Sequence, residues 1–264
     1  MFSRRHPYLF FLLIMAAMFT VGIIFLSTMA KSLSRKDSAI RGEKVGVIEI
    51  AGAIADSKTI IDQIKTFRDA DAVKAIVLRI DSPGGGVGAS QEIYREIQRT
   101  VAEKHVVASM GAVAASGGYY VAAACDGIVA NPGTITGSIG VIMGYTNFEE
   151  LLRKIGLSPV VIKSGAYKDL GSPMRPMTAE EEVLLQALIG NIHRQFVAAI
   201  AEGRGMETDR VDAIADGRLF TGEEAIDLGL VDRLGNLEDA ITWAGELGGI
   251  EGEVETVYPE QDRM

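Results

Sequence analysis

The segment KAIVLRIDSPGGG at residues 74–86 is an apolar run that ends in a proline and three glycines. Apolar and β-branched residues in such a run predict a buried β-strand, and the glycines predict a tight turn directly after it. A helix is predicted over residues 87–101 and another strand over residues 105–110. The residues that repeat at helical spacing between the two strands are Val87, Ile93, Ile97 and Val101.

The same alternation begins before this segment. Residues 44–50, KVGVIEI, predict another strand, and residues 57–67 carry isoleucines and a phenylalanine at the spacing of one helix face. The order from residue 44 to residue 110 is therefore strand, helix, strand, helix, strand. Short apolar strands joined by helical crossovers are typical of an α/β fold with a mainly parallel sheet that is covered on both faces.

Segments further along the chain continue the pattern. Residues 127–130 and residues 159–163 are further strand candidates because both are short apolar runs. Three pairs of residues have the capping-box spacing that marks the start of a helix. These pairs are Asn147 with Glu150, Thr178 with Glu181, and Thr221 with Glu224.

The composition excludes several classes of protein. The formal net charge is -9 and the isoelectric point is about 5.0, so a basic surface that holds nucleic acid is not expected. The chain has a single cysteine, Cys125, which excludes an internal disulfide and leaves too few thiols for a zinc site. We interpret Cys125 as a buried, unreactive thiol, so the stability of the fold is expected to come from packing.

Residues 7–30 contain no charge and are long enough as a helix to cross a hydrocarbon layer of about 30 Å. We predict a retained transmembrane anchor there, although the sequence TMA at its end is a weak signal-peptidase exit. Positive charges lie on both sides of the span and leave its orientation undecided. The remaining divisions are a cytoplasmic end at 1–6, a polar linker at 31–43, one folded domain at 44–250 and an acidic tail at 251–264.

One hydroxyl, Ser116, lies in a segment of small residues, MGAVAASGG at 110–118. Ligands of open α/β sheets bind beyond the carboxyl ends of the strands, where both glycine turns, 84–86 and 117–118, are expected. A plain tight turn is one interpretation of 84–86, and a phosphate loop is disfavoured because the Lys-Ser/Thr ending of that motif is missing. Together, the two turns can supply backbone N–H groups for an oxyanion hole.

A serine nucleophile needs a base. The chain has three histidines, His6, His105 and His193. We interpret them as terminal, surface or satisfied residues, so a Ser-His-Asp triad has no obvious base. A lysine can serve when its pKa is lowered enough for the amine to be neutral. Lys163 and Lys168 are both candidates, and residue chemistry alone does not separate them. Either is too far from Ser116 for a local helical contact, so the fold or a neighbouring subunit must bring them together.

Four motifs, taken in order and at their intervals, resemble the signal peptide peptidase A (SppA) family of membrane-anchored serine proteases, from about Val45 to Leu247. The resemblance implies a ClpP/crotonase-like α/β fold with repeated β-β-α units and an enzyme that uses no metal and no cofactor. The motifs are DSPGGGV at 81–87, SMGAVAASGGYYVAAACD at 109–126, TGSIGVIM at 136–143 and KSGAYKDLGSPMRPMT at 163–178.

The resemblance also implies roles for individual residues. Ser116 matches the nucleophile and Lys168 matches the general base of a Ser-Lys dyad. Gly85 and Gly117 match the positions whose backbone amides make the oxyanion hole. Ser138 matches the hydroxyl that orients the base. The choice of Lys168 over Lys163 comes from this resemblance.

The implied function is a membrane-anchored serine endopeptidase that degrades cleaved signal peptides and other apolar peptides at the membrane. One copy of each motif resembles the short, single-domain form. We expect a homo-oligomer of about eight subunits, in which Ser116 and Lys168 can come from adjacent subunits. The expected location is the bacterial cytoplasmic (inner) membrane, with one span and the catalytic domain on the extracytoplasmic side. Small residues around Ser116 predict an apolar pocket.

Two alternatives belong to other classes. A crotonase-like enzyme that acts on acyl thioesters would use the same paired amides, but it needs neither a matched serine and lysine nor a membrane span. A catalytically inactive scaffold of the same fold would bind peptides or membrane proteins, but it has no need to retain Ser116, Lys168 and Ser138. Cleavage of an apolar peptide distinguishes the three functions.

Overall fold

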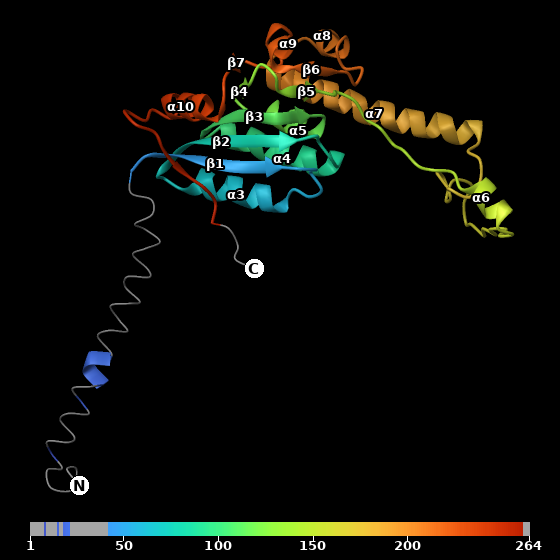
Figure 1. The fold of residues 1–264 in the computed structure, drawn as a ribbon, viewed down its shortest axis with the longest axis horizontal. Coiled ribbons are helices and arrows are strands. Elements are labelled where there is room, and N and C mark those ends of the chain that lie inside the picture. Colours follow the sequence, from blue (N-terminus) through green and yellow to red (C-terminus); the bar gives the residue numbers. More distant parts are fainter. Residues whose placement is uncertain (1–7, 9–14, 16–17, 22–41, 261–264) are drawn as a thin grey trace.

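The computed structural model describes residues 8, 15, 18–21 and 42–260. Within these residues one eight-stranded sheet runs through the body, and a long helix leads from the body to an outlying segment (Figure 1). The first half of the body alternates strands and helices as predicted. Its elements are β1 (Lys44–Ala51), α3 (Lys58–Asp69), β2 (Val73–Ser82), α4 (Val87–Val101), β3 (His105–Ala115) and α5 (Gly117–Ala122).

The second half adds short strands and the remaining helices. The strand order is β6-β5-β3-β2-β1-β8, with β4 beside β3 and β7 beside β4. Every pair of named strands is parallel except β5 with β6, which confirms the mainly parallel sheet. The elements are β4 (Gly127–Ala130), β5 (Ile135–Gly137), α6 (Glu149–Lys154), α7 (Ala179–Arg204), α8 (Thr208–Asp212), β6 (Leu219–Thr221), α9 (Gly222–Asp227), β7 (Arg233–Leu234), α10 (Leu237–Leu247) and β8 (Glu255–Val257).

Side chains that alternate along β2 pack into two separate cores. Ile76, Leu78 and Ile80 pack with buried residues of α3 and α4. Ala75 and Val77 point to the opposite face and pack with α10. Successive residues of a strand face opposite sides of a sheet, so helices on both sides are needed to bury a continuous apolar run. The prediction that the sheet is covered on both faces is confirmed.

The β-β-α units implied by the resemblance are present in reduced form. The chain after β1 and the chain after β2 form a single parallel bridge between Ile54 and Gly85. β3 makes two successive pairings, with β4 at residues 107–109 and with β5 at residues 113–115. The end of β2 also lies beside the end of β3, where Ser82 pairs with Ala114. These pairings bring the two glycine turns together at the carboxyl ends of the strands.

A helix begins at or close to all three predicted starts, but the predicted capping box forms at only two of them. Complete capping boxes are present at Thr178 and at Thr221, at the starts of α7 and α9. Asn147 does not form the predicted box with Glu150, because α6 begins at Glu149 and Asn147 Oδ1 accepts a hydrogen bond from the Glu149 amide instead. A further box at Asn236 begins α10 and was not predicted.

The strand predicted over residues 159–163 is also wrong. These residues have no regular secondary structure, and Val160 and Ile162 are 85% and 96% exposed. A strand needs a partner for its backbone groups, and this segment pairs with none of the described strands. Residues 159–163 therefore form an exposed apolar segment and do not add a strand to the sheet.

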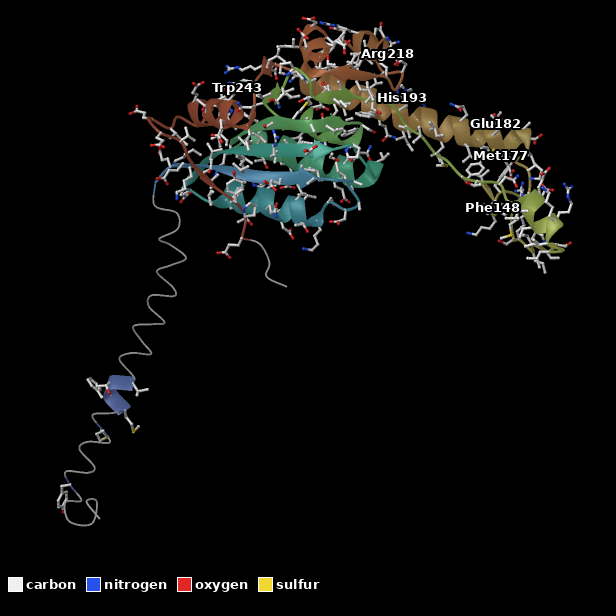
Figure 2. The ribbon with its side chains drawn as sticks, in the orientation of Figure 1. Phe148, Met177, Glu182, His193, Arg218 and Trp243 are labelled. Atoms are coloured by element: carbon white, nitrogen blue, oxygen red, sulfur yellow. The ribbon has the colours of Figure 1, made fainter. Side chains whose placement is uncertain are left out.

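α7 joins the body to an outlying segment, residues 142–178, which we call the arm. Phe196, Val197 and Ile200 in the second half of α7 are buried in the body, whereas most of its first half is exposed. Figure 1 shows the arm with α6 extending away from the sheet, and Figure 2 places Glu182 beside the arm and His193 nearer the body. The helix therefore acts as a spacer.

The predicted membrane span at residues 7–30 lies almost entirely outside the described residues, as do residues 1–6 and most of the linker at 31–43. Residues 8, 15 and 18–21 are helical. By length and composition, one helix of the described part of the chain is apolar enough to cross a membrane, and it is α7. Because the second half of α7 packs in the core of the body, its length and apolar composition are weak evidence that α7 crosses a membrane. In the predicted acidic tail, β8 pairs with β1.

Candidate active site

Ser116 lies in the turn between β3 and α5 with a strained backbone. Its φ of 53° and ψ of -119° are rare for a residue with a side chain. The Ser116 N–H donates to the carbonyl oxygen of Gly137 at 2.8 Å, and its carbonyl oxygen accepts from the Tyr120 N–H at 2.8 Å. Such strain persists only where surrounding structure enforces it, and a serine on a sharp strand-to-helix turn presents its hydroxyl outward.

The two glycine turns are packed backbone against backbone. A Cβ added to Gly84, which has a φ of 101°, would lie 2.6 Å from the Gly117 nitrogen and 2.8 Å from the Ser116 Cβ. A Cβ added to Gly85 would lie 2.3 Å from the carbonyl oxygen of Ile54. At these distances a side chain would displace the backbone, so glycine is required at both positions. Glycine at these positions therefore allows the two turns to pack closely beside Ser116.

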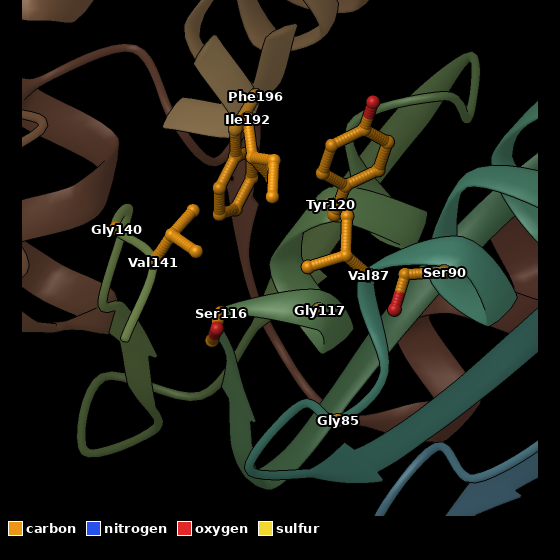
Figure 3. Close-up of a pocket in the computed structure, with 10 residues that line it drawn as sticks. All are labelled: Gly85, Val87, Ser90, Ser116, Gly117, Tyr120, Gly140, Val141, Ile192 and Phe196. Atoms are coloured by element: carbon orange, nitrogen blue, oxygen red, sulfur yellow. The ribbon is translucent and has the colours of Figure 1, made fainter. Parts of the chain in front are cut away.

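Two backbone N–H groups near Ser116 have no partner among the described residues. Ile54 donates its N–H to the Gly84 oxygen at 2.9 Å and accepts the Gly86 N–H at 2.8 Å, which leaves the Gly85 N–H between them unused. The Gly117 N–H lies in the first turn of α5, where a helix cannot satisfy its own donors. Both glycines line the same pocket as Ser116 (Figure 3).

The rest of this pocket is mainly apolar. Figure 3 shows the side chains of α4, α5 and α7 facing the space next to Ser116. Tyr120 and Phe196 are buried, and their rings pack at a tilt of 36° with centroids 4.7 Å apart. These residues were not predicted to line a pocket, although Ile192 and Phe196 are four residues apart and therefore lie on one face of a helix. The apolar residues that line the pocket are Val87, Tyr120, Val141, Ile192 and Phe196.

Ser90 is a further pocket residue that was not predicted from the sequence. It lines the pocket, is 1% exposed and donates from its Oγ to the Gly86 oxygen at 3.1 Å. A Cβ on Gly117 would lie 2.5 Å from this Oγ. Ser90 therefore ties the start of α4 to the glycine turn, and no signal in the sequence beyond its place after that turn indicated it.

Ser138 follows Gly137, the residue whose carbonyl oxygen accepts the Ser116 N–H. Its φ is 50°, so it shares the unusual left-handed backbone of Ser116. The Ser138 N–H donates to the carbonyl oxygen of Arg218 at 2.8 Å, which joins it to the start of β6. The structure thus places the predicted base-orienting residue next to the serine turn through the backbone.

Lys168 is not brought to Ser116 within this chain. It is exposed in a turn of the arm. The neighbouring Asp169 is held through Arg175 to Glu181 in the first turn of α7. From Glu181 to Ile192, which lines the pocket, an α-helix rises about 16 Å. A lysine side chain does not span that distance, so the structure shows four of the five predicted site residues together and the fifth apart.

The other candidate bases have partners of their own. The Nζ of Lys163 donates to the Ala166 oxygen at 2.8 Å and to the Asp169 carboxylate at 2.6 Å. His193 Nε2 and the carbonyl oxygen of Ala215 are 2.7 Å apart. His105 Nδ1 lies 3.4 Å from the Asp126 carboxylate. None of these residues lines the pocket, and His6 lies outside the described residues.

Cys125 is buried as predicted. It is 4% exposed, and burial raises the pKa of its thiol. A thiol that resists ionisation is a poor nucleophile, so Cys125 is not a rival to Ser116.

Two family models and several known proteases match this chain. The model of Peptidase family S49 matches residues 98–251, and the Clp protease model matches residues 36–134. A putative protease of Synechocystis sp. is 49% identical over 211 residues, which cover 79% of this chain and 76% of that relative. A putative signal peptide peptidase SppA of Enterococcus faecium is 36% identical over 213 residues, which cover 75% of this chain and 62% of that relative.

Some relatives are much longer than this chain. Protease 4 of Salmonella typhi is 38% identical over 224 residues, which cover 81% of this chain but 36% of that relative. The Clp protease match and the parallel sheet confirm the ClpP-like α/β fold. The match to the S49 model covers more than half of the chain and includes Ser116, Ser138 and Lys168. This chain therefore belongs to peptidase family S49, the family of the SppA-type proteases.

Proposed function

We propose that this protein is a serine endopeptidase in which Ser116 is the nucleophile and Lys168 is the general base. The observation that carries the proposal is the strained Ser116 turn, which lies beside two unused backbone N–H groups in a mainly apolar pocket. An acyl-transfer enzyme needs a nucleophile and N–H donors for the oxygen anion at one place.

Acylation begins when the neutral amine of Lys168 takes the proton of the Ser116 hydroxyl. The serine oxygen bonds to the carbonyl carbon of the substrate, whose oxygen becomes an anion. The N–H groups of Gly85 and Gly117 donate to this anion, and each such donor is worth about 3 kcal/mol of barrier. The C–N bond then breaks, the Lys168 ammonium gives its proton to the leaving amine, and an acyl-enzyme ester remains.

Deacylation repeats these steps with water. Lys168 takes a proton from the water, whose oxygen attacks the ester carbonyl and forms a second oxygen anion in the same place. The bond to the Ser116 oxygen breaks, Lys168 returns the proton to that oxygen, and the free acid leaves. In this scheme Ser138 accepts or donates a hydrogen bond at the lysine amine and sets its direction.

The scheme requires a Lys168 from a second copy of the chain. The arm and the first half of α7 expose many large apolar side chains, which favours burial against another subunit. Among them Ile142 is 97% exposed and Ile162 is 96% exposed. We propose a homo-oligomer of about eight subunits with sites shared between neighbours.

The proposed substrates are remnant signal peptides and other apolar peptides. An apolar lining beside Ser116 favours apolar side chains. The proposed location is the bacterial cytoplasmic membrane, with residues 7–30 as a single span, residues 31–43 as the linker and residues 44–250 as the protease domain on the extracytoplasmic side. The name of the Enterococcus faecium relative, a putative signal peptide peptidase, supports this substrate class.

The test is cleavage of a fluorogenic apolar peptide by the full chain in detergent. Ser116→Ala and Lys168→Ala should each lower kcat by a factor of about 10³ or more. Lys154→Ala, at an exposed lysine of the arm outside the ion pairs around Lys168, is the matched control and should retain most of the activity. A fluorophosphonate should label Ser116, located by mass spectrometry. Cleavage that survives Ser116→Ala or Lys168→Ala, or labelling at another serine, refutes the proposal.

A further inference from the structure

Arg175 is the centre of an ion-pair cluster in the arm. Its Nε donates to the Asp169 carboxylate at 2.9 Å, and its two terminal nitrogens donate to the Glu181 carboxylate at 2.8 Å and 2.5 Å. It also donates to the carbonyl oxygens of Asp169 and Pro176, at 3.3 Å and 3.0 Å. A guanidinium that uses all three nitrogens in this way fixes the geometry of its partners.

This cluster holds the turn that carries Lys168. Asp169 is the next residue, and its carboxylate also accepts a hydrogen bond from Lys163. The Lys168 N–H donates to the Gly165 oxygen at 3.2 Å. Side chains of Asp169 and Glu181 are 13% and 4% exposed, in contrast to most of the arm. The lysine turn is therefore tied down at its carboxyl side while Lys168 remains exposed.

The same cluster connects the turn to α7. Glu181 closes the capping box of this helix, because it accepts the Thr178 N–H while Thr178 accepts the Glu181 N–H. At its other end α7 is buried in the body, where Phe196 lines the Ser116 pocket. Arg175 thus joins the lysine turn to a rigid helix whose far end is part of a serine site.

We propose that Arg175 is a positioning residue for Lys168, which clamps the lysine turn to the start of α7 so that the amine reaches the serine site at a defined place. This inference rests on the proposed function, because it takes Lys168 as the base. It assigns a role to the clamp of Arg175, Asp169 and Glu181 that goes beyond the dyad and the oxyanion hole.

The clamp also balances charge around the lysine. On its own segment Lys168 has Lys163, Asp169 and Arg175 as charged neighbours. The first turn of α7 adds Glu180, Glu181 and Glu182. Loss of the Arg175 charge would leave Asp169 with Lys163 as its cationic partner. It would leave Glu181 with no cationic partner among the ion pairs of the described residues. A more negative surrounding favours the protonated amine, so the activity of such a variant should need a higher pH.

The experiment compares Arg175→Gln, Arg175→Lys and the control Arg153→Gln in the full chain. Arg153 also pairs with a carboxylate, Glu150, on the arm, but that pair is exposed and lies outside the clamp. Arg175→Gln should lower kcat by about 10- to 100-fold with KM changed less than about threefold, because a small misplacement of a reacting group costs rate. The acid limb of its kcat–pH profile should move to higher pH.

Arg175→Lys separates the effect of the clamp geometry on kcat from the effect of the Arg175 charge on the pH profile. It keeps the charge but loses the planar fork, so kcat should fall about tenfold while the acid limb stays in place. Arg153→Gln should match the wild type in both. Thermal unfolding and the size of the assembled particle are measured on each variant, and kcat is expressed per folded chain in assembled particles, so loss of folded protein is not counted as loss of positioning.

The outcomes separate the two proposals. Wild-type kcat and an unmoved acid limb in Arg175→Gln, with Lys168→Ala inactive, would overturn the clamp and leave the dyad standing. An equal loss of kcat in Arg153→Gln would also overturn it, because the effect would then belong to the arm as a whole. Wild-type activity in Lys168→Ala would overturn the dyad and the clamp together.

Discussion

The serine turn and the lysine turn are held by different forces. Gly84, Gly85 and Gly117 pack backbone against backbone around Ser116, at the ends of strands that are buried on both faces. The turn of Lys168 is held by ion pairs at the end of a long helix, outside the body. The nucleophile and its N–H donors are therefore organised within one chain. The proposed base depends on a clamp and, in our proposal, on a second copy.

The largest expected effect tests whether the two turns meet between chains. Ser116→Ala and Lys168→Ala should each be inactive, and particles assembled from an equal mixture of the two should recover about a quarter of wild-type activity. A shared site needs an intact serine and an intact lysine from different subunits, each present with a probability of one half. The measurement is peptide cleavage after dissociation and joint reassembly. No recovery in mixed particles would place both residues of a site in one chain.

The next effect compares one glycine from each turn. Gly85→Ala should lower kcat by about 10²-fold, because its Cβ would meet the Ile54 backbone and displace the N–H donor. Gly165→Ala in the lysine turn should stay within about twofold, since a Cβ there meets nothing within 4 Å. Fluorophosphonate labelling of Ser116 should show the same contrast. Equal losses in both variants would contradict the view that only the serine turn is closely packed.

A smaller effect is expected from acid. Hydrogen bonds from Arg175 lower the pKa of the Glu181 carboxyl to about 2 and also lower the pKa of Asp169. Because these pKa values are lower in the folded state, the clamp stabilises the arm fully above the unfolded values of about 4 and loses this effect as the pH falls toward 2. Hydrogen-exchange protection of residues 163–175 should drop about tenfold by pH 3.

The control for this prediction is Glu181→Gln, which should show weak protection of the lysine turn already at pH 6 and little further change on acidification. Residues 113–120 of the serine turn, held by backbone hydrogen bonds, serve as the internal reference. A parallel drop in both turns would mean that acid unfolds the body, and the clamp would then not be the sensitive part.

The smallest effect concerns the surfaces of the two regions. Cys125 should resist alkylation at pH 8, because the thiol is buried and burial raises its pKa. Ile162→Cys places a thiol on the arm at a position that is 96% exposed. We expect it to react readily in dissociated subunits and a few-fold more slowly in assembled particles. Unchanged reactivity on assembly would show that this part of the arm does not lie in the interface.

Much of the body could be predicted because its elements follow from local patterns. The run 74–86 contains both its strand and its turn, and the helix after it has a regular apolar face. The same reasoning failed at 159–163, where an equally apolar run has no strand partner among the described residues. An apolar sequence pattern indicates which residues are kept from water, but it does not indicate which surface of the molecule or of a partner covers them.

The candidate site was predicted in part for a similar reason. Residue chemistry left Lys163 and Lys168 equivalent, and the family resemblance chose between them. The structure adds a physical distinction, because the Lys163 amine is bound to Asp169 and to the Ala166 oxygen. It also shows Ile192 and Phe196 at the pocket, although they lie far from Ser116 in the sequence.

From the sequence alone came the α/β class, the order of the elements from β1 to β3, Ser116 and the two glycine turns, since each depends on neighbours within a few residues. Only the tertiary structure showed that the turns pack so closely that Cβ atoms are excluded, and that α7 carries the lysine turn away from the body. Contacts between residues distant in sequence depend on how whole elements pack, which no local pattern encodes.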